Sequence, residues 1–131
     1  MIAKAKIQTK YKTEIDARGH ALIADEPIEN GGQNLGPSPG DLLRSALAAC
    51  TAITLKMYAD RKEWNVGAID VNVEYKKNLD DMEANFHVQV SFENKSLTQE
   101  QLIRLEQIAN KCPVHKILEK GHEIDVLMSD L

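Results

Sequence analysis

Hydrophobic and polar residues alternate along four stretches of this chain, at residues 2–15, 69–76, 86–93 and 124–128. A period of two places every second side chain on the same face, which is typical of a strand with one buried and one solvated face. Residues 20–24 follow a turn signal that ends in Gly19, so we expect them to return beside the first strand as a hairpin. A second turn is predicted at 78–81, which makes the two central strands another hairpin.

Three other stretches follow the helical period. The longest covers residues 39–64, with Ser38 as its expected N-cap, and its first half is apolar nearly all round, so we expect it to be buried in the core. A second helix begins with a capping box at 98–101 and carries apolar residues as far as Ala109. Cys112 and Pro113 interrupt this pattern, and a short third helix is predicted at 114–120.

The order of these elements is strand, strand, helix, strand, strand, helix, short helix, strand. It predicts the α+β class, with an antiparallel sheet of hairpins packed on the long central helix, in one domain that spans residues 1–131. Residues 27–40 hold three prolines and four glycines, and they form a loop of a length that is usually functional or mobile.

Composition narrows the function classes. The net charge of −4 argues against a nucleic-acid-binding protein, whose binding surface should be basic. No run approaches the ~18 apolar residues of a membrane span, and the N-terminus has no apolar signal-peptide region. We therefore predict a cytoplasmic protein without a membrane partner. Disulfides in that compartment are usually transient and catalytic, which draws attention to the two cysteines.

The cysteines differ in their surroundings. Cys50 lies among small residues in the middle of the long predicted helix, and by itself it is read as a small packed hydrophobe. Cys112 is expected at the N-cap of the short helix, where the dipole would stabilise a thiolate. His115 shares a helical face with Cys112, but these two residues would need further ligands to hold zinc. Arg18, in a turn, is by default a solvated charge.

Two longer motifs carry a resemblance. The segments GPSPGDLLRSALAAC (36–50) and NKCPVHKILEKGHEIDV (110–126) closely resemble the OsmC/Ohr family of thiol peroxidases, and the order of elements matches this family over nearly the whole chain. The resemblance implies the OsmC-like fold, an intertwined homodimer with both sites at the subunit interface, and no metal or organic cofactor.

The resemblance also assigns roles. It implies that Cys50 is the peroxidatic thiolate, which reduces an organic hydroperoxide and becomes a sulfenic acid. Cys112 would then form a disulfide with Cys50, which a dithiol such as dihydrolipoamide would reduce. Arg18 matches the family arginine that holds the thiolate ionised. If these roles are right, we expect the Cα atoms of the two cysteines within about 7 Å of each other.

The chain departs from the best-studied branch of the family at the start of the long helix. That branch has Asn-Pro-Glu, and its Glu pairs with the arginine, whereas this chain has Ser38-Pro39-Gly40. Asp41 is adjacent, but in a regular helix it lies half a turn away from the face of Cys50. Two rival hypotheses follow: a non-catalytic module of the same fold that binds a small apolar ligand or a protein partner at the dimer interface, and a thiol-redox sensor.

Overall fold

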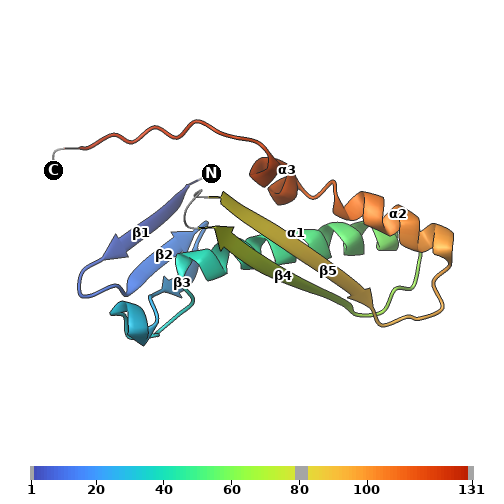
Figure 1. The fold of residues 1–131 in the computed structure, drawn as a ribbon, viewed down its shortest axis with the longest axis horizontal. Helices are drawn as coiled ribbons and strands as arrows, with labels where there is room; N and C mark the ends of the chain where they lie inside the picture. Colours follow the sequence, from blue (N-terminus) through green and yellow to red (C-terminus); the bar gives the residue numbers. More distant parts are fainter. Residues whose placement is uncertain (1, 79–82, 130–131) are drawn as a thin grey trace. The chain divides into compact units, whose positions relative to one another are not determined.

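The structure is a computed structural model, and it describes residues 2–78 and 83–129. The chain divides into two compact units, Met1–Ser45 and Ala46–Leu131, which are described separately here. Strands and helices follow in the order β1–β3, a 3₁₀ turn, α1, β4, β5, α2 and α3 (Figure 1). All strand pairs are antiparallel, so the predicted α+β class with hairpin sheets is confirmed. The prediction of a single domain over residues 1–131 stays a prediction.

The first unit contains a three-stranded sheet in the order β1-β2-β3, formed by Ala3–Ile7, Thr13–Ala17 and His20–Ala24. The prediction of one strand over residues 2–15 was wrong, because a turn separates β1 from β2. At this turn Lys10 takes a positive φ of 51°. Alternation of polar and apolar residues continues through the turn, so the hydrophobic pattern carried no sign of it.

The β2–β3 hairpin turns on two residues, Arg18 and Gly19. Both have positive φ, 55° and 85°, as the primed hairpin turns require. The backbone N–H of Gly19 donates to Asp16 Oδ1 over 2.9 Å, which closes the turn. The predicted hairpin is therefore confirmed, and Arg18 lies exposed at its tip.

The loop between β3 and α1 is tied down. Asp25 is 2% exposed, and its two carboxylate oxygens accept hydrogen bonds from the backbone N–H groups of Glu26 and Leu35 at 2.7 and 3.2 Å. Its own N–H donates to the carbonyl of Pro37. A Cβ at Gly32 would lie 2.0 Å from the carbonyl oxygen of Glu26, so the backbone segments pack too closely for a side chain. A carboxylate bound across the loop thus holds it in a defined conformation.

Helix α1 covers Pro39–Arg61 and begins as predicted. Ser38 Oγ accepts from the N–H of Asp41 at 3.1 Å, and Asp41 Oδ2 accepts from the N–H of Ser38 at 3.0 Å, which completes a capping box. The Asp41 carboxylate also forms an ion pair with Arg44. The start of α1 therefore satisfies its own backbone donors with local side chains.

The end of α1 falls earlier than the predicted residue 64. The N–H of Trp64 bonds to the carbonyl of Ala59 at 2.8 Å, and the N–H of Glu63 bonds to that of Asp60 at 3.1 Å. This is a Schellman motif, and Glu63 supplies the left-handed residue with a φ of 58°. Glycine is the usual residue at this position, so the glutamate at 63 did not predict the end of the helix.

The buried face of α1 also differs from the prediction. Its buried residues form one stripe, Leu47, Thr51, Leu55, Tyr58 and Ala59, and four of these five lie in the second half of the helix. On another side, Leu43, Ile53 and Met57 are 41%, 54% and 68% exposed. The expectation of a buried first half was wrong, because Leu47 is the only buried residue of that half in the described part of the chain.

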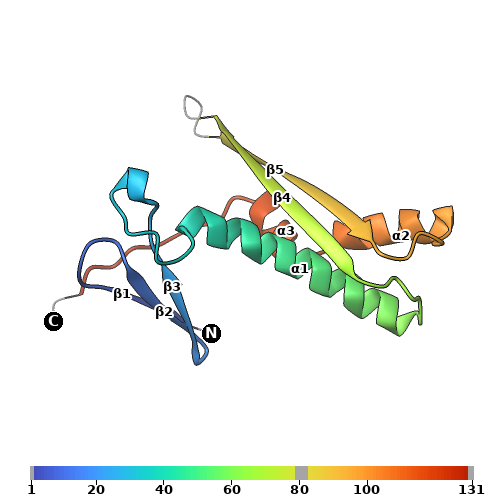
Figure 2. The same ribbon diagram turned by 90° about the horizontal axis from the view of Figure 1, so that it is seen from below.

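The second unit packs β4 (Ile69–Asn78), β5 (Glu83–Phe92), α2 (Gln99–Ala109) and α3 (Pro113–Glu119) with the rest of α1. Helix α2 runs beside the C-terminal half of α1 in both views (Figures 1 and 2). The core lies between these helices and the hairpin, and it consists of Leu55, Tyr58, Ala59, Val66, Leu105 and Ile108, with Val90 and Phe92 packed against them. The predicted capping box at Thr98 is present. The turn predicted at 78–81 lies mostly outside the described residues.

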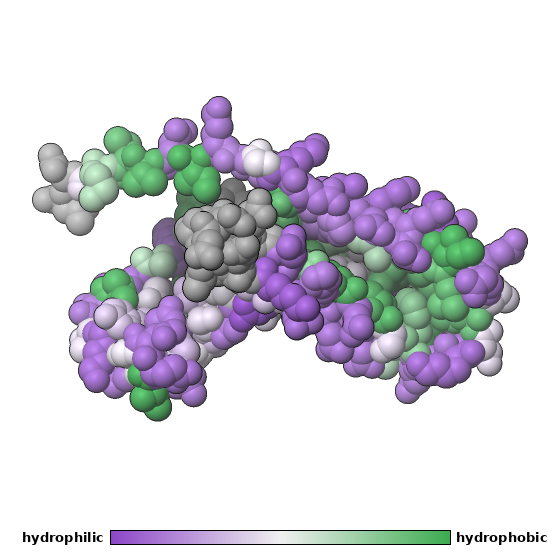
Figure 3. All heavy atoms as spheres, viewed as in Figure 1, coloured by the Kyte–Doolittle hydropathy of each residue, from purple (hydrophilic) through white to green (hydrophobic). Residues whose placement is uncertain are grey.

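The last predicted strand, at 124–128, was wrong. Residues 121–129 form no helix or strand in the described part of the chain. Ile124, Val126 and Met128 are 83–87% exposed, and hydrophobic residues line the surface of this segment in Figure 3. A strand needs a partner for its backbone hydrogen bonds, and among residues 2–78 and 83–129 no strand pairs with this segment.

Candidate functional site

The two cysteines come from different helices of the second unit. Cys50 lies in the middle of α1 and is half-buried, while Cys112 is fully buried, with 0% exposure. Cys112 is the N-cap of α3, and Pro113 is the first residue of that helix. Both cysteines are free thiols. The break between α2 and α3 therefore brings Cys112 inward to the side of α1.

The two thiols contact each other. The Cys112 side chain forms a hydrogen bond with Cys50. Burial raises the pKa of the Cys112 thiol above its ordinary value of 9.0, and the hydrogen bond to Cys50 and charge on that neighbour raise it further. The backbone N–H of His115 and the hydroxyl of Thr51 act in the opposite direction but do not reverse the shift. Cys112 thus holds its proton more firmly than an ordinary thiol does.

This geometry corrects one expectation. Cys112 does occupy the N-cap of α3, but its side chain makes no capping hydrogen bond. The dipole of this short helix does not outweigh burial, so the pKa of Cys112 moves up and not down. The neighbouring Cys50 thiol and burial in the core, not the helix dipole, set the direction of the Cys112 pKa shift.

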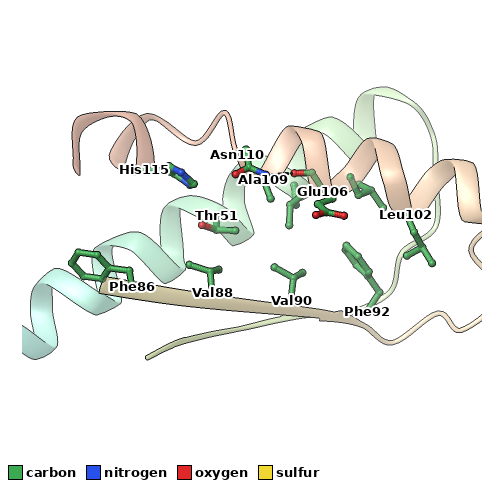
Figure 4. A pocket seen from close by; sticks show the side chains of 12 residues that line it. Thr51, Phe86, Val88, Val90, Phe92, Leu102, Glu106, Ala109, Asn110 and His115 are labelled. Carbon is green, nitrogen blue, oxygen red and sulfur yellow. Dashed lines mark hydrogen bonds between the residues drawn. The ribbon is translucent and has the colours of Figure 1, made fainter. Parts of the chain in front are cut away.

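A cavity of about 510 Å³ lies between α1, β5 and α2 (Figure 4). Neither sulfur lines it, but Thr51, which follows Cys50 in α1, does. One wall is β5, which contributes Phe86, Val88, Val90 and Phe92. Helix α2 forms the opposite wall. Most lining side chains are apolar, which is typical of a pocket for a small organic molecule.

His115 joins this cavity to a second one. The second cavity, of about 300 Å³, is also lined by His115, Phe86 and Val88. The Nε2 atom of His115 lies 2.5 Å from Glu119 Oε1, one turn later in α3. The imidazole is 25% exposed. Helix α3 therefore supplies both the Cys112 thiol and an oriented imidazole beside the cavities.

Arg18 and Asp41 belong to the first unit. Within residues 2–78 and 83–129 the structure gives Arg18 no ion pair or side-chain hydrogen bond. The carboxylate of Asp41 binds Ser38 and Arg44, and these contacts hold its pKa below the ordinary value. A Cβ at Gly40 would meet only ordinary contacts, 3.6 Å from Arg44, so packing does not require glycine there. The role of Arg18 stays a prediction.

Two other site types were considered. In the described part of the chain, no three His, Cys, Asp or Glu side chains gather as a metal site would require. Cys112 and His115 thus lack the further ligands that a zinc ion would need. None of the helices among these residues has both the length and the hydropathy to span a membrane.

Sequence reasoning missed several residues of the site. The sequence pattern assigned no role to Thr51 or Glu106, and it indicated for His115 only a helical face shared with Cys112. Helical periodicity places Leu102, Leu105, Glu106 and Ala109 on neighbouring positions of α2, and this signal was available. It could not reveal that β5 lies opposite this face, since that pairing is not local.

Comparisons with known proteins agree on the fold. The family model described as OsmC-like protein matches residues 31–126. A structure from Psychrobacter arcticus, of a protein assigned to osmotic stress and detoxification response, is 24% identical with a TM-score of 0.78; the match covers 88% of this chain and 85% of that one. An OsmC-like protein of Mycoplasma pneumoniae is 20% identical, with a TM-score of 0.71 and coverages of 90% and 86%.

A third similar structure carries a functional name. It is an organic hydroperoxide resistance protein, OsmC, of Legionella pneumophila, 19% identical with a TM-score of 0.66, and the match covers 89% of this chain and 87% of that one. No curated protein matches the chain. At these identities the structures establish the likeness of the fold.

Proposed function

Because the chain belongs to the family of OsmC-like proteins, we propose that it is a thiol peroxidase that reduces organic hydroperoxides. The observation that carries the proposal is the contact between Cys50 and Cys112, which come from α1 and α3. Two free thiols in contact, one half-buried and one fully buried, have the arrangement that an attacking and a resolving cysteine need.

The first step takes place at Cys50. Its thiolate attacks the terminal oxygen of the hydroperoxide ROOH, an S–O bond forms, the O–O bond breaks, and RO⁻ leaves with the bonding pair. The alkoxide takes up a proton and leaves as the alcohol ROH. Cys50 is oxidised by two electrons to the sulfenic acid. The Cys112 side chain, in contact with Cys50, places a hydrogen-bonding partner beside the reacting sulfur.

The second step uses the neighbour. The Cys112 sulfur attacks the Cys50 sulfur, an S–S bond forms, and hydroxide leaves and takes up the thiol proton as water. A dithiol then reduces the disulfide by two exchange steps and becomes a disulfide itself. Because the two cysteine side chains are already in contact, the attack of the Cys112 sulfur on the Cys50 sulfur requires little movement of the backbone.

We propose a homodimer as the working form. Leu43, Ile53 and Met57 leave one side of α1 exposed, and Cys50 is half-buried on the same helix. The exposed segment 121–129 adds further uncovered hydrophobic residues. Sedimentation equilibrium should give twice the mass of one chain, and Ile53→Glu, which places a charge on this side, should shift the mass to that of the monomer.

Arg18 is proposed to hold the Cys50 thiolate ionised in the assembled protein, as its family position suggests. Gly40 stands where the best-studied branch has a glutamate, so Arg18 lacks that carboxylate and the peroxidase rate should be lower. Space exists for a side chain at this position. Gly40→Glu should therefore raise the rate in wild type and leave the Arg18→Ala variant unchanged, which would connect the two residues.

The deciding experiment is hydroperoxide consumption with a dithiol. The full chain is mixed with cumene hydroperoxide and dihydrolipoamide, and the remaining peroxide is followed for wild type, Cys50→Ser and Cys112→Ser. We expect turnover only where Cys50 is present. Full activity in Cys50→Ser would disprove the mechanism.

A non-catalytic binding role is the second candidate, and the 510 Å³ cavity favours it. In this case the cavity would bind a small apolar molecule, and the two cysteines would serve as packing residues without redox chemistry. Alkylation of Cys50 by iodoacetamide across a pH series separates the two candidates. A peroxidatic Cys50 reacts well below the pH at which an ordinary thiol does, whereas a packed Cys50 does not.

A further inference from the structure

The larger cavity combines an apolar wall with one carboxylate, that of the exposed Glu106. Phe86, Val88, Val90 and Phe92 occupy alternate positions of β5, so all four side chains point to the same face of the strand and into the cavity. Helix α2 faces them across the cavity (Figure 4). The carboxylate of Glu106 extends from α2 into the space above Val90 and Phe92.

The charge of Glu106 has no counterion in the cavity. The lining residues include no lysine or arginine in the described part of the chain, and His115 is the other ionisable one. Among the same residues Glu106 forms no ion pair, and its backbone carbonyl, not its carboxylate, receives the side chain of Asn110 at 2.9 Å. His115 is bonded to Glu119.

Glu106 lies where a long ligand in this cavity would pass its carboxylate. Thr51 and His115 mark the end near the thiols, and Leu102 and Phe92 mark the other end (Figure 4). Glu106 lies between these ends. A molecule that lies along this cavity with its reacting group at the thiol end therefore lays its tail past the Glu106 carboxylate.

We propose that Glu106 makes this cavity select neutral, elongated apolar molecules and reject those that carry a carboxylate. Two negative charges a few ångströms apart repel each other, and a tenfold loss of affinity corresponds to about 1.4 kcal/mol. A fatty acid would bring its anion beside the Glu106 carboxylate in a space that no described lysine or arginine lines, whereas its ester or alcohol would bury the same chain without that repulsion. That the ligand is a hydroperoxide rests on the proposed function; the charge preference does not.

Binding tests the preference without any turnover. Full-length Cys50→Ser protein is titrated with 1-decanol and with decanoate at pH 8 by isothermal calorimetry. These probes share a ten-carbon chain and differ in charge. We expect decanol to bind about tenfold more tightly than decanoate. Glu106→Gln in the same background should bring the two affinities close together, chiefly by tighter binding of decanoate.

A matched control is available on the same helix. Glu100 is exposed in the first turn of α2 and does not line the cavity. Glu100→Gln changes the net charge by the same amount, so it should leave the tenfold preference intact. Equal affinities for both probes in the parent protein, the same preference in Glu106→Gln, or no binding of either probe would each overturn the inference.

A kinetic arm separates this inference from the proposed function. Wild type should consume the hydroperoxide of methyl linoleate with a KM about tenfold lower than that for the hydroperoxide of free linoleic acid, and Glu106→Gln should narrow this ratio. If neither is consumed while decanol still binds in preference to decanoate, the proposed function fails and the selectivity stands. If both are consumed with equal KM, the selectivity fails and the peroxidase stands.

Discussion

Two helices of this protein begin in nearly the same way and use their first side chain differently. Helix α1 follows Ser38-Pro39, and α3 follows Cys112-Pro113. Ser38 closes a capping box with Asp41, so its side chain serves the helix. The Cys112 thiol forms no capping hydrogen bond of regular geometry, although the backbone N–H of His115 lies near enough to act on its pKa, and it contacts Cys50. The Ser38 side chain therefore serves its own helix, whereas the Cys112 side chain also contacts a second thiol.

The largest effect on hydroperoxide consumption is expected from replacing Cys50, the thiol that Cys112 contacts. Cys50→Ser leaves α3 and its N-cap in place but takes away the sulfur that Cys112 contacts. Hydroperoxide consumption should fall to the rate of buffer alone, since a hydroxyl at this position is a far weaker nucleophile than a thiolate. The ferrous oxidation assay for residual peroxide measures this. Turnover at a rate near that of wild type would refute the division of roles between the two cysteines.

Cys112→Ser should abolish formation of the disulfide with Cys50 but leave the free energy of unfolding nearly unchanged. Serine is among the preferred N-cap residues, so α3 gains a capping group and the free energy of unfolding should stay within about 1 kcal/mol of wild type. The resolving thiol is lost, so a sulfenic acid should persist at Cys50 after peroxide treatment. Dimedone labelling with intact-mass analysis detects it. A variant that still forms the intramolecular disulfide would exclude Cys112 as the resolving residue.

Ser38→Ala makes the opposite change at the other helix start. Loss of the capping hydroxyl should cost about 1 kcal/mol in the free energy of unfolding, with no effect on disulfide formation between the cysteines. Urea denaturation of the reduced protein measures the stability term. Ser45→Ala, at an exposed interior position of α1, is the control and should change stability by much less. If Ser38→Ala were as stable as this control, the capping box would not explain how α1 begins.

The smallest effect concerns pH. The pKa of Cys112 is raised in the folded state, so the unfolded chain loses this proton at a lower pH than the folded chain. The stability from this group is therefore complete below pH 9 and is lost as the pH rises through the folded pKa. Reduced wild type should lose more stability between pH 8 and pH 10.5 than Cys112→Ala, as measured by urea midpoints in a phosphine reductant. Identical losses would mean that Cys112 titrates as an ordinary thiol.

The sequence predicted those parts of the fold that local chemistry determines. The start of α1 is predicted by its N-cap Ser38, by Pro39 and by Asp41 in the first turn. The β4–β5 hairpin is predicted by the alternation at residues 69–76 and 86–93. The end of α1 was missed because Glu63 takes a left-handed conformation that glycine usually supplies. The last strand was predicted from alternation alone, but a strand also needs a partner, and residues 121–129 have none in one chain.

The site was less predictable than the fold. Spacing of the cysteines along the chain carries no sign of their contact, and the pairing came from the resemblance to a family. The direction of the Cys112 pKa shift depends on burial and on a neighbour far away in sequence, neither of which a local helix argument contains. That Glu106 and His115 line one cavity follows only from the packing of β5 and α3, which the local sequence does not determine.

The most direct test of the account is the state of the two thiols after one equivalent of oxidant. Reduced wild-type protein is treated with one equivalent of tert-butyl hydroperoxide, the remaining thiols are alkylated, and the protein is analysed by intact-mass and peptide mass spectrometry. The account predicts the loss of two hydrogen atoms and one disulfide that joins the peptides of Cys50 and Cys112 within a chain. Two alkylated cysteines with the peroxide unconsumed would contradict it.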